Sequence, residues 1–275
     1  MADQRTLEQL REHYEIEKEL ANRLRTATKD ERGKLFGEVY DEMLRRVPMH
    51  PQLMQKASPE AKARAVARQF SFAKRFIKPT DVFLEVGPGD CSFALEVTKH
   101  ARQVYAVDVS DEITKGFTAP PNFKLVLSDG QSIPAEPGSV QVAYSNQLME
   151  HLHPDDAAEQ LQNIYRALAP GGLYVCITPN RLSGPHDISA AFDLVATGFH
   201  LKEYTVGELS RLFKQVGFSD VSFYVAIKNV AVRVPMFMIL GLEGFLNMLP
   251  SKLRVKLARG RLISRLLSIT LVGRK

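Results

Sequence analysis

Short stretches rich in β-branched and aromatic residues alternate with helical patterns between residues 81 and 227. The β-rich runs include DVFLEVG, QVYAVDV, FKLVLS, VQVAYS and GLYVCITP, and the helical patterns include CSFALEVTKH, DEITKGF and PDDAAEQLQNIYRALA. This alternation is typical of an α/β fold with a doubly wound, mostly parallel sheet. Because crossovers between parallel strands are right-handed, functional loops are expected at the carboxyl ends of the strands.

Helical regions precede this alternation. Apolar residues recur at helical intervals through residues 3–47, and Asp30 punctuates this stretch. A further helix is expected from Ser58, as N-cap with Pro59 at the first helical position, through Phe76.

Two further segments interrupt the regular alternation near the end of the chain. DVSFYVAI and the final SITLVGRK are both predicted as strands, and the stretch between them is far longer than a hairpin loop. The expected organisation is a helical extension (1–76) followed by a main α/β domain (77–275).

Composition places the chain among folded proteins. Of 275 residues, 45% are apolar and 24% are charged, which is unlike a disordered chain. The longest apolar run, VPMFMILGLEGFLNMLP, is interrupted by Glu243 and is too short for a confident membrane span. Cys91 and Cys176 have no metal-binding spacing, so no metal site and a cytoplasmic, reducing location are expected.

The positive charge is concentrated at the end of the chain. The net charge is +5, yet residues 251–275 carry eight Lys or Arg and no acid. KLRVKLARGRLISRLL is interpreted as a solvated amphipathic helix, with an anionic membrane as the next reading and nucleic acid as the last, since no aromatic residue is present for base stacking. For the apolar run before it, burial against the core is the default. Contact of residues 234–267 with a membrane or a lipophilic acceptor is the alternative.

The stretch LEVGPGD lies where the first strand turns into the first helix. Gly87 and Gly89 supply two glycines of the dinucleotide pattern G-x-G-x-x-G, but Ser92 stands where the third is expected. Glu85 precedes the first glycine, and its carboxylate would repel a pyrophosphate but not a cationic or zwitterionic ligand. An NAD(P)-dependent oxidoreductase is therefore the less favoured reading.

Acidic residues follow the next two strands. Asp108 comes nineteen residues after Gly89, where an acid can accept the hydroxyls of a ribose. Asp129, in LSDG, is placed to meet an adenine amino group. Either aspartate could instead be a turn or capping residue.

The ordered set LEVGPGD, VYAVDVS, LSDG, YSNQLMEHL and LAPGGLYVCITPN resembles a class I S-adenosylmethionine-dependent methyltransferase of the bacterial small-molecule type, over residues 75–228. This resemblance implies a Rossmann-like sheet whose antiparallel last strand, SITLVGRK, pairs with the DVSFYVAI strand. Residues 229–266 are then a helical insertion, residues 179–204 a substrate-side loop, and residues 1–76 a helical extension or lid. The implied product is S-adenosylhomocysteine. The family's third loop glycine falls at Cys91. The implied cofactor contacts are Glu85, Gly87 and Gly89 for the methionine part, Asp108 with Val109 for the ribose, Asp129 with Gly130 for the adenine, and Asn146 through His151 along the cofactor and acceptor.

The resemblance implies methyl transfer to a small acceptor, expected at oxygen. His151 is the first candidate for a general base, with a structural histidine at a helix start as the equal alternative. His186 is the second candidate. His200 is expected to order its loop, and His153 to lie on the surface.

Other acceptors and partners stay open at this point. A lipid-linked, glycan or RNA acceptor is the alternative to a small molecule, and nucleic acid is the least expected partner. The N-terminal helices are interpreted as structural or as the face of a homodimer.

Overall fold

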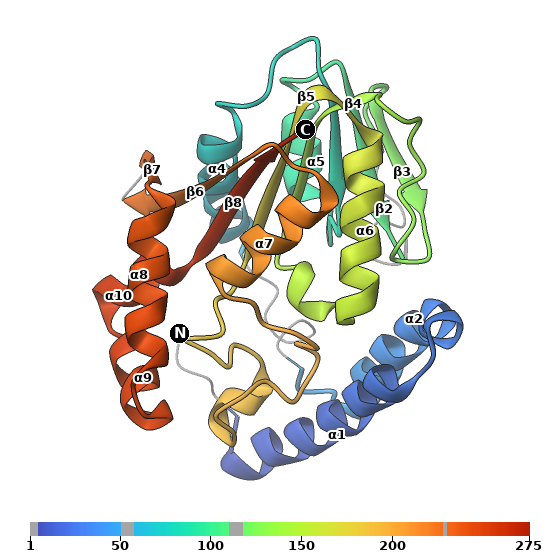
Figure 1. The fold of residues 1–275 in the computed structure, drawn as a ribbon. Coiled ribbons are helices and arrows are strands. Elements are labelled where there is room, and N and C mark those ends of the chain that lie inside the picture. Colours follow the sequence, from blue (N-terminus) through green and yellow to red (C-terminus); the bar gives the residue numbers. More distant parts are fainter. Residues whose placement is uncertain (1–4, 51–57, 110–117, 228–229) are drawn as a thin grey trace.

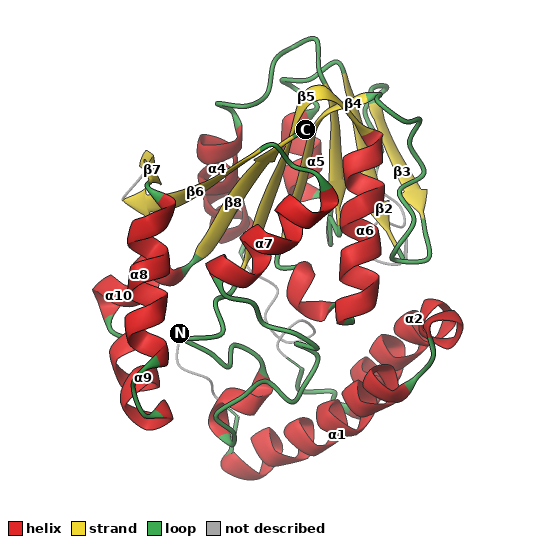
Figure 2. Ribbon diagram, viewed as in Figure 1, coloured by secondary structure: helices red, strands yellow, loops and turns green. Residues whose placement is uncertain are grey.

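The computed structural model describes residues 5–50, 58–109, 118–227 and 230–275. The predicted helix DEITKGF therefore lies outside the described residues. Within them, eight strands form one sheet in the order β3-β2-β1-β4-β5-β8-β6-β7 (Figures 1 and 2). The strands are β1 Val82–Val86, β2 Gln103–Asp108, β3 Phe123–Leu127, β4 Val140–Asn146, β5 Leu168–Thr178, β6 Asp220–Ile227, β7 Val230–Val234 and β8 Ile269–Arg274.

The strand pairing confirms the predicted doubly wound fold. The pairs among β1 to β5 are parallel, whereas β8 runs antiparallel to both β5 and β6. The chain's last strand therefore pairs with the DVSFYVAI strand, as expected. Strand order reverses beside β1, between β2 and β4, and ligands of such sheets bind outside the carboxyl ends of the strands at this switch point.

Helices cover both faces of the sheet (Figure 2). Helices α6 and α7 lie on one face of the sheet and α4 and α5 on the other. Helices α1 and α2 lie beyond the carboxyl ends of the parallel strands. The helical elements are α1 Leu7–Thr26, α2 Lys29–Arg46, α4 Pro59–Ala73, α5 Ser92–Val97, η2 Met149–His151, α6 Pro154–Ala167, η3 Ile188–Ala191, α7 Val206–Val216, α8 Met236–Asn247, α9 Ser251–Ala258 and α10 Arg261–Leu267.

The hydrophobic core is split by the sheet. Strand β1 is buried along its whole length. Its Leu84 packs with one cluster of buried residues and its Phe83 with another. This follows from the alternation of side chains along a strand, and it fixes the carboxyl end of β1 in the middle of the molecule.

The N-terminal helices break at a different residue from the one expected. Helix α2 begins after Thr28, and Asp30 lies inside it. A capping box explains the earlier start, because the Glu31 side chain accepts hydrogen bonds from the N–H and hydroxyl of Thr28. Helix α4 begins at Pro59 after the Ser58 N-cap, as predicted, but ends at Ala73 rather than Phe76.

The N-terminal extension packs in two separate places. Helices α1 and α2 form their own apolar cluster, which includes Phe199 and Leu201 of the 179–204 loop. Helix α4 instead contributes Ala73 to the core on the α5 face of the sheet. Of the extension predicted as a lid, α1 and α2 therefore lie against the 179–204 loop, whereas α4 does not pack with them in this cluster.

The insertion before the last strand is not wholly helical. It opens with β7, an unexpected edge strand that pairs antiparallel with β6. KLRVKLARGRLISRLL does not form one helix either, because α9 ends at Ala258 and α10 begins at Arg261. Gly260 lies in this break, as expected from its low helix propensity.

Helix α8 is buried on one face only. The expected burial of its apolar run therefore holds for the inward face and not for the outward one. Its inward side chains are Ile239, Glu243 and Leu246. The Glu243 carboxylate accepts hydrogen bonds from the N–H groups of Val206 (2.6 Å) and Gly207 (3.0 Å) at the start of α7. The residue that interrupts the apolar run thus anchors α8. Among the described residues, no helix is long and apolar enough to cross a membrane.

Candidate active site

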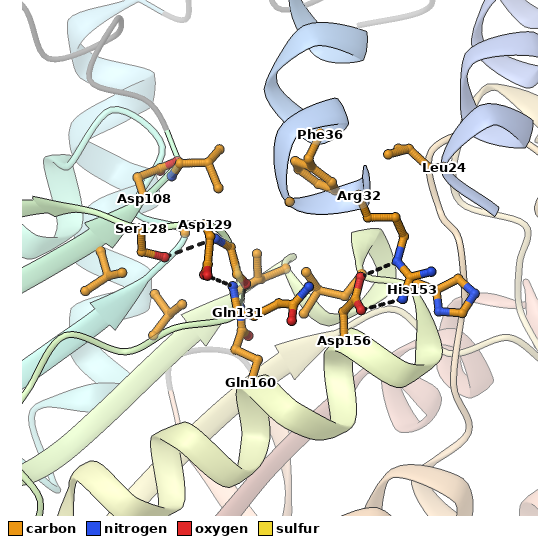
Figure 3. Close-up of a pocket in the computed structure, with 18 of the residues that line it drawn as sticks. Leu24, Arg32, Phe36, Asp108, Ser128, Asp129, Gln131, His153, Asp156 and Gln160 are labelled. Carbon is orange, nitrogen blue, oxygen red and sulfur yellow. Dashed lines mark hydrogen bonds and ion pairs between the residues drawn. The ribbon is translucent and has the colours of Figure 1, made fainter. Parts of the chain in front are cut away.

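A pocket lies at the carboxyl ends of β1, β2 and β3; we call it the strand-end pocket (Figure 3). Five residues predicted to contact a cofactor line it together: Gly87, Asp108, Val109, Asp129 and Gly130. They come from three separate segments of the chain. These segments are separate in the sequence, and the parallel sheet brings them together at the carboxyl ends of its strands.

The loop after β1 has the backbone that its glycines permit. Gly87 has φ +68° and donates its N–H to the Val107 carbonyl at 2.9 Å. A Cβ at this position would lie 3.0 Å from Leu148 Cδ1. Cys91, at the position of the family's third glycine, has φ +57°, which is uncommon for a non-glycine residue. Burial raises the pKa of the Cys91 thiol to about 12, so it stays protonated.

Two aspartates face the strand-end pocket with different hydrogen bonds (Figure 3). Asp108 Oδ1 accepts from the Val109 N–H at 2.7 Å. Asp129 Oδ1 accepts from the N–H groups of Gln131 (2.9 Å) and Ser132 (2.7 Å). Burial would raise the pKa of Asp129, but these hydrogen bonds outweigh it and lower the pKa. Asp129 therefore closes its own turn and also lines the pocket.

Glu85, Gly89 and Asn146 are not among the residues that line this pocket. Glu85 is buried behind the loop, and its Oε2 is buried with no hydrogen-bond partner among the described residues. Burial raises the pKa of Glu85 well above its usual range, and Asp90 and Asp108 add to the effect. This shift favours the neutral form of the carboxyl, and the repulsion of a pyrophosphate by its charge stays a prediction.

Helix α2 closes one side of the strand-end pocket, as Figure 3 shows for Arg32 and Phe36. Arg32 forms a bidentate ion pair with Asp156 of α6, with Nε–Oδ2 and Nη2–Oδ1 distances of 2.6 Å. His153, expected at the surface, is half-buried, lines the pocket and caps α6. The cavity is only about 80 Å³, well below the ~300–1,000 Å³ of ordinary ligand pockets. A nucleoside would require these side chains to move aside.

A second, larger cavity of about 500 Å³ lies between α1, α2 and the 179–204 loop; we call it the histidine pocket. Four histidines line it: His50, His151, His186 and His200. Charged residues at its wall are Arg5, Glu17 and Asp187. Both catalytic candidates of the sequence, His151 and His186, are thus brought to one cavity.

His151 lies in η2, directly after β4, and is held on one side. Its Nδ1 is 3.0 Å from Tyr40 Oη and 3.2 Å from the Phe199 carbonyl oxygen. Because a carbonyl only accepts, Nδ1 carries the proton of the neutral ring. Burial, together with the nearby His200, lowers the pKa of His151 to about 4.

His186 and His200 share one carboxylate. Glu203 Oε1 accepts from His200 Nδ1 at 2.7 Å and from the His186 N–H at 2.7 Å, and Glu203 Oε2 lies 3.4 Å from His186 Nδ1. Burial would lower the pKa of His200, but Glu203, Glu150 and Asp187 outweigh it and raise the pKa. His200 therefore orders its loop, as the sequence suggested.

Sequence reasoning missed the contribution of the N-terminal helices to both pockets. Arg32 and Phe36 in one pocket and Glu17 and Tyr40 in the other were assigned only to a lid. Their spacing carried a signal for helices but none for function. The burial of Arg32, which shows that it has a partner, is visible only in the structure.

More than half of the chain, residues 54–222, matches the family described as methyltransferase domain. The chain belongs to this family. A probable S-adenosylmethionine-dependent methyltransferase of Mycolicibacterium smegmatis is 31% identical over 137 residues, which cover 49% of this chain and 51% of the relative. A ribosomal RNA small subunit methyltransferase A of Dehalococcoides mccartyi is 46% identical over 57 residues, 19% of this chain and 20% of the relative. The chain thus spans about half or less of the curated relatives it matches.

Solved structures agree with this methyltransferase fold. Phosphoethanolamine N-methyltransferase 1 of Haemonchus contortus, solved with phosphoethanolamine and S-adenosylhomocysteine, has a TM-score of 0.57 at 12% identity over 90% of this chain and 50% of that one. A similarity at this identity shows the fold alone.

S-adenosylmethionine is the cofactor of this methyltransferase family, and the chemistry of the strand-end pocket suits it. Apolar side chains of Val86, Val107, Leu148 and Leu152 line the pocket beside the carboxylate of Asp108. A nucleoside has apolar ring faces and polar hydroxyls, which matches this combination. A side chain at Gly87 would press on Leu148, which also lines this pocket.

Proposed function

We propose that this methyltransferase transfers the methyl group of S-adenosylmethionine to a hydroxyl group of a small acceptor in the histidine pocket. The observation that carries this proposal is the position of the two pockets. The strand-end pocket is lined by Leu148 and Leu152, and the histidine pocket by His151, which lies between them in the chain. Cofactor and acceptor would therefore meet at the segment after β4.

The proposed cofactor contacts are those of the sequence. Asp108 with Val109 would hold the ribose, and Asp129 with Gly130 would hold the adenine. Glu85, Gly87 and Gly89 would shape the loop against the methionine part, and Asn146 would begin the segment that faces the reacting group. When bound, S-adenosylmethionine supplies a methyl group that is already activated by its positively charged sulfur.

The chain's own part is to orient the acceptor and accept its proton. His186 lines the histidine pocket and is held by Glu203, so its ring can take a proton from a hydroxyl and keep it beside a carboxylate. His151, fixed by Tyr40 and Phe199, is proposed to line the binding site of the acceptor. The closed helices α1 and α2 would exclude water from both groups.

Calorimetry with S-adenosylhomocysteine tests the cofactor half of this proposal. We expect binding of near-micromolar affinity that is lost in Asp108→Ala, while NAD does not bind. Labelled S-adenosylmethionine would then be screened against small alcohols, amines and RNA, with His186→Asn as the variant expected to lose turnover but keep cofactor affinity. Binding of NAD instead, or labelling of RNA only, would contradict the proposal.

We also propose that the insertion rests on an anionic membrane surface. The outward face of α8 and its neighbours is apolar: Phe237 is 76% exposed and Met248 84%. Further exposed apolar side chains on the same insertion are Met238, Leu240, Phe245, Leu253, Leu257 and Leu262. A helix that turns Glu243 inward and phenylalanines outward is arranged for an apolar partner on its outer side.

Charge favours a bilayer as that partner. The basic residues of the same segment are Lys252, Arg254, Lys256, Arg259, Arg261 and Arg265, and no acidic residue lies among them. Basic side chains beside an apolar surface bind anionic lipid headgroups while the apolar side chains enter the acyl boundary. A lipophilic acceptor could then reach the enzyme from the bilayer.

Co-sedimentation with vesicles tests this surface. We expect binding to vesicles that contain phosphatidylglycerol, weaker binding to pure phosphatidylcholine, and loss in Phe245→Glu/Met248→Glu. Leu7→Glu is the matched control, because Leu7 is an equally apolar side chain, 67% exposed, on α1 and not on the insertion. The proposal is contradicted if the wild type does not bind vesicles but forms a concentration-dependent dimer that the double variant loses. A second copy of the chain would then cover this face.

A further inference from the structure

Three potential metal ligands meet beside the histidine pocket. Glu150 and His151 lie in η2, and His200 comes from the 179–204 loop. Each offers one ligand atom, and these atoms all lie within 4.8 Å of one another. The segments are far apart in the sequence, so the cluster exists only in the folded chain.

Glu150 is the strongest pointer to a cation. It is fully buried, and its Oε2 accepts a hydrogen bond from Thr178 Oγ1 at 2.8 Å. Its Oε1 is buried with no hydrogen-bond partner in the part of the chain that the structure describes. A buried carboxylate oxygen without a partner is costly, because its hydration is lost and nothing replaces it. A metal ion bound to this oxygen would take the place of the lost water.

Both histidines use the same ring nitrogen, Nδ1, for a hydrogen bond within the chain. His151 Nδ1 is used by the Phe199 carbonyl and His200 Nδ1 by the Glu203 carboxylate, at 3.2 and 2.7 Å. Since both partners only accept, each neutral ring carries its proton on Nδ1 and keeps the Nε2 lone pair for a ligand role. Metal-bound histidines almost always have such a carboxylate or carbonyl partner on the other nitrogen.

We propose that Glu150, His151 and His200 bind a divalent transition-metal ion of the zinc class. Two imidazoles and one carboxylate are the ligand set of catalytic zinc sites, which keep a further position open. Because His151 and His200 line the histidine pocket, that open position faces the cavity. The ion would hold an oxygen or nitrogen of the acceptor there. This role of the ion rests on the proposed function, whereas the binding of the ion to the three side chains does not.

The neighbouring group of His13, Glu17 and His50 is a poorer site, although its ligand atoms are equally close. Both carboxylate oxygens of Glu17 are engaged, by His13 Nε2 and by the Phe199 N–H, each at 2.9 Å. The Arg5 guanidinium lies 2.6 Å from His13 Nδ1 and would repel a cation. This group therefore serves as an internal control.

Zinc titration of the tag-free full chain, stripped with EDTA, tests the site by calorimetry. We expect one equivalent of Zn²⁺ with submicromolar affinity and at least 100-fold weaker binding in Glu150→Gln. Glu203→Gln changes the carboxylate that His200 shares with His186 but none of the proposed ligands, and we expect it to bind zinc roughly 10–100-fold more weakly. Glu17→Gln should bind zinc like the wild type. Circular dichroism and thermal unfolding of each variant show whether it is folded.

Co²⁺ in place of zinc gives a second readout, since its visible absorption reports nitrogen and oxygen ligands and should be lost in Glu150→Gln. The site is overturned if the stripped protein binds no zinc, or if Glu17→Gln and not Glu150→Gln abolishes binding. Titration with S-adenosylhomocysteine separates the two proposals. Cofactor binding without zinc binding removes the metal site alone, whereas zinc binding without cofactor binding removes the proposed function alone.

Discussion

Arg32 of α2 and Asp156 of α6 form a buried bidentate ion pair that joins the N-terminal hairpin to the sheet domain (Figure 3). Arg32 Nη1 also donates to the Ala27 carbonyl at 2.8 Å, so the pair fixes the corner between α1 and α2 as well. Both residues line the strand-end pocket, so this one contact holds α2 against α6 at the wall of the pocket.

Breaking this pair from one side should be costly. Arg32→Met leaves Asp156 buried without a partner, and we expect a loss of about 3–5 kcal/mol in unfolding free energy by urea titration. The double variant Arg32→Met/Asp156→Leu removes both charges and should recover much of that loss. A double variant no more stable than the single one would contradict the importance of the unpaired charge.

Movement of α2 should accompany cofactor binding. The strand-end cavity is about 80 Å³ because side chains of α1 and α2 reach into it. We expect S-adenosylhomocysteine to change the amide hydrogen exchange of residues 24–36, with α7 as an internal reference that does not line the pocket. Unchanged exchange in saturated protein would mean that the cofactor binds without moving this helix.

Gly87→Ala should impair cofactor binding more than Gly89→Ala. Both positions have positive φ, so both variants pay the same kind of backbone strain. Only at residue 87 does the added Cβ meet a neighbour, at 3.0 Å from Leu148, whereas nothing lies within 4 Å at residue 89. Calorimetry measures the affinity of each variant for S-adenosylhomocysteine. An equal loss of affinity in both variants would mean that backbone strain alone, and not the contact with Leu148, causes the loss.

Cys91→Gly should be more stable than Cys91→Ala by about 1 kcal/mol, because alanine keeps the cost of a left-handed backbone at φ +57° and glycine does not. Both variants lose the same buried sulfur, so their difference isolates the backbone. Thermal and urea unfolding of the two proteins give the comparison. An alanine variant equal to the glycine variant would show that this turn relaxes at no cost.

Glu85 should make stability fall as the pH rises. Burial raises the pKa of Glu85 in the folded state well above its ordinary value of 4.5. Between 4.5 and the raised value, the folded state therefore binds more protons than the unfolded state. Stability from this group is complete below pH 4.5 and is lost as the pH rises through the folded pKa. Glu85→Gln should flatten this dependence in urea titrations at pH 4.5 and 7.5. An identical pH dependence in wild type and variant would contradict it.

The sequence determined the sheet and the cofactor-side residues. Strand–helix alternation specifies the doubly wound order because hydrophobic period and crossover handedness leave few alternatives, and it therefore places Gly87, Asp108 and Asp129 at one edge. Local chemistry also specified the start of α4, through Ser58 and Pro59.

Only the tertiary structure decided what the helices outside the sheet contribute. Nothing local to Arg32, Tyr40 or Glu243 indicates a partner more than 30 residues away, and each partner is met only when packing brings two elements together. The same holds for Glu150, His151 and His200, whose segments lie about 50 residues apart along the chain. Local propensity specifies elements, whereas burial of polar groups, which must find partners in the folded chain, specifies the site.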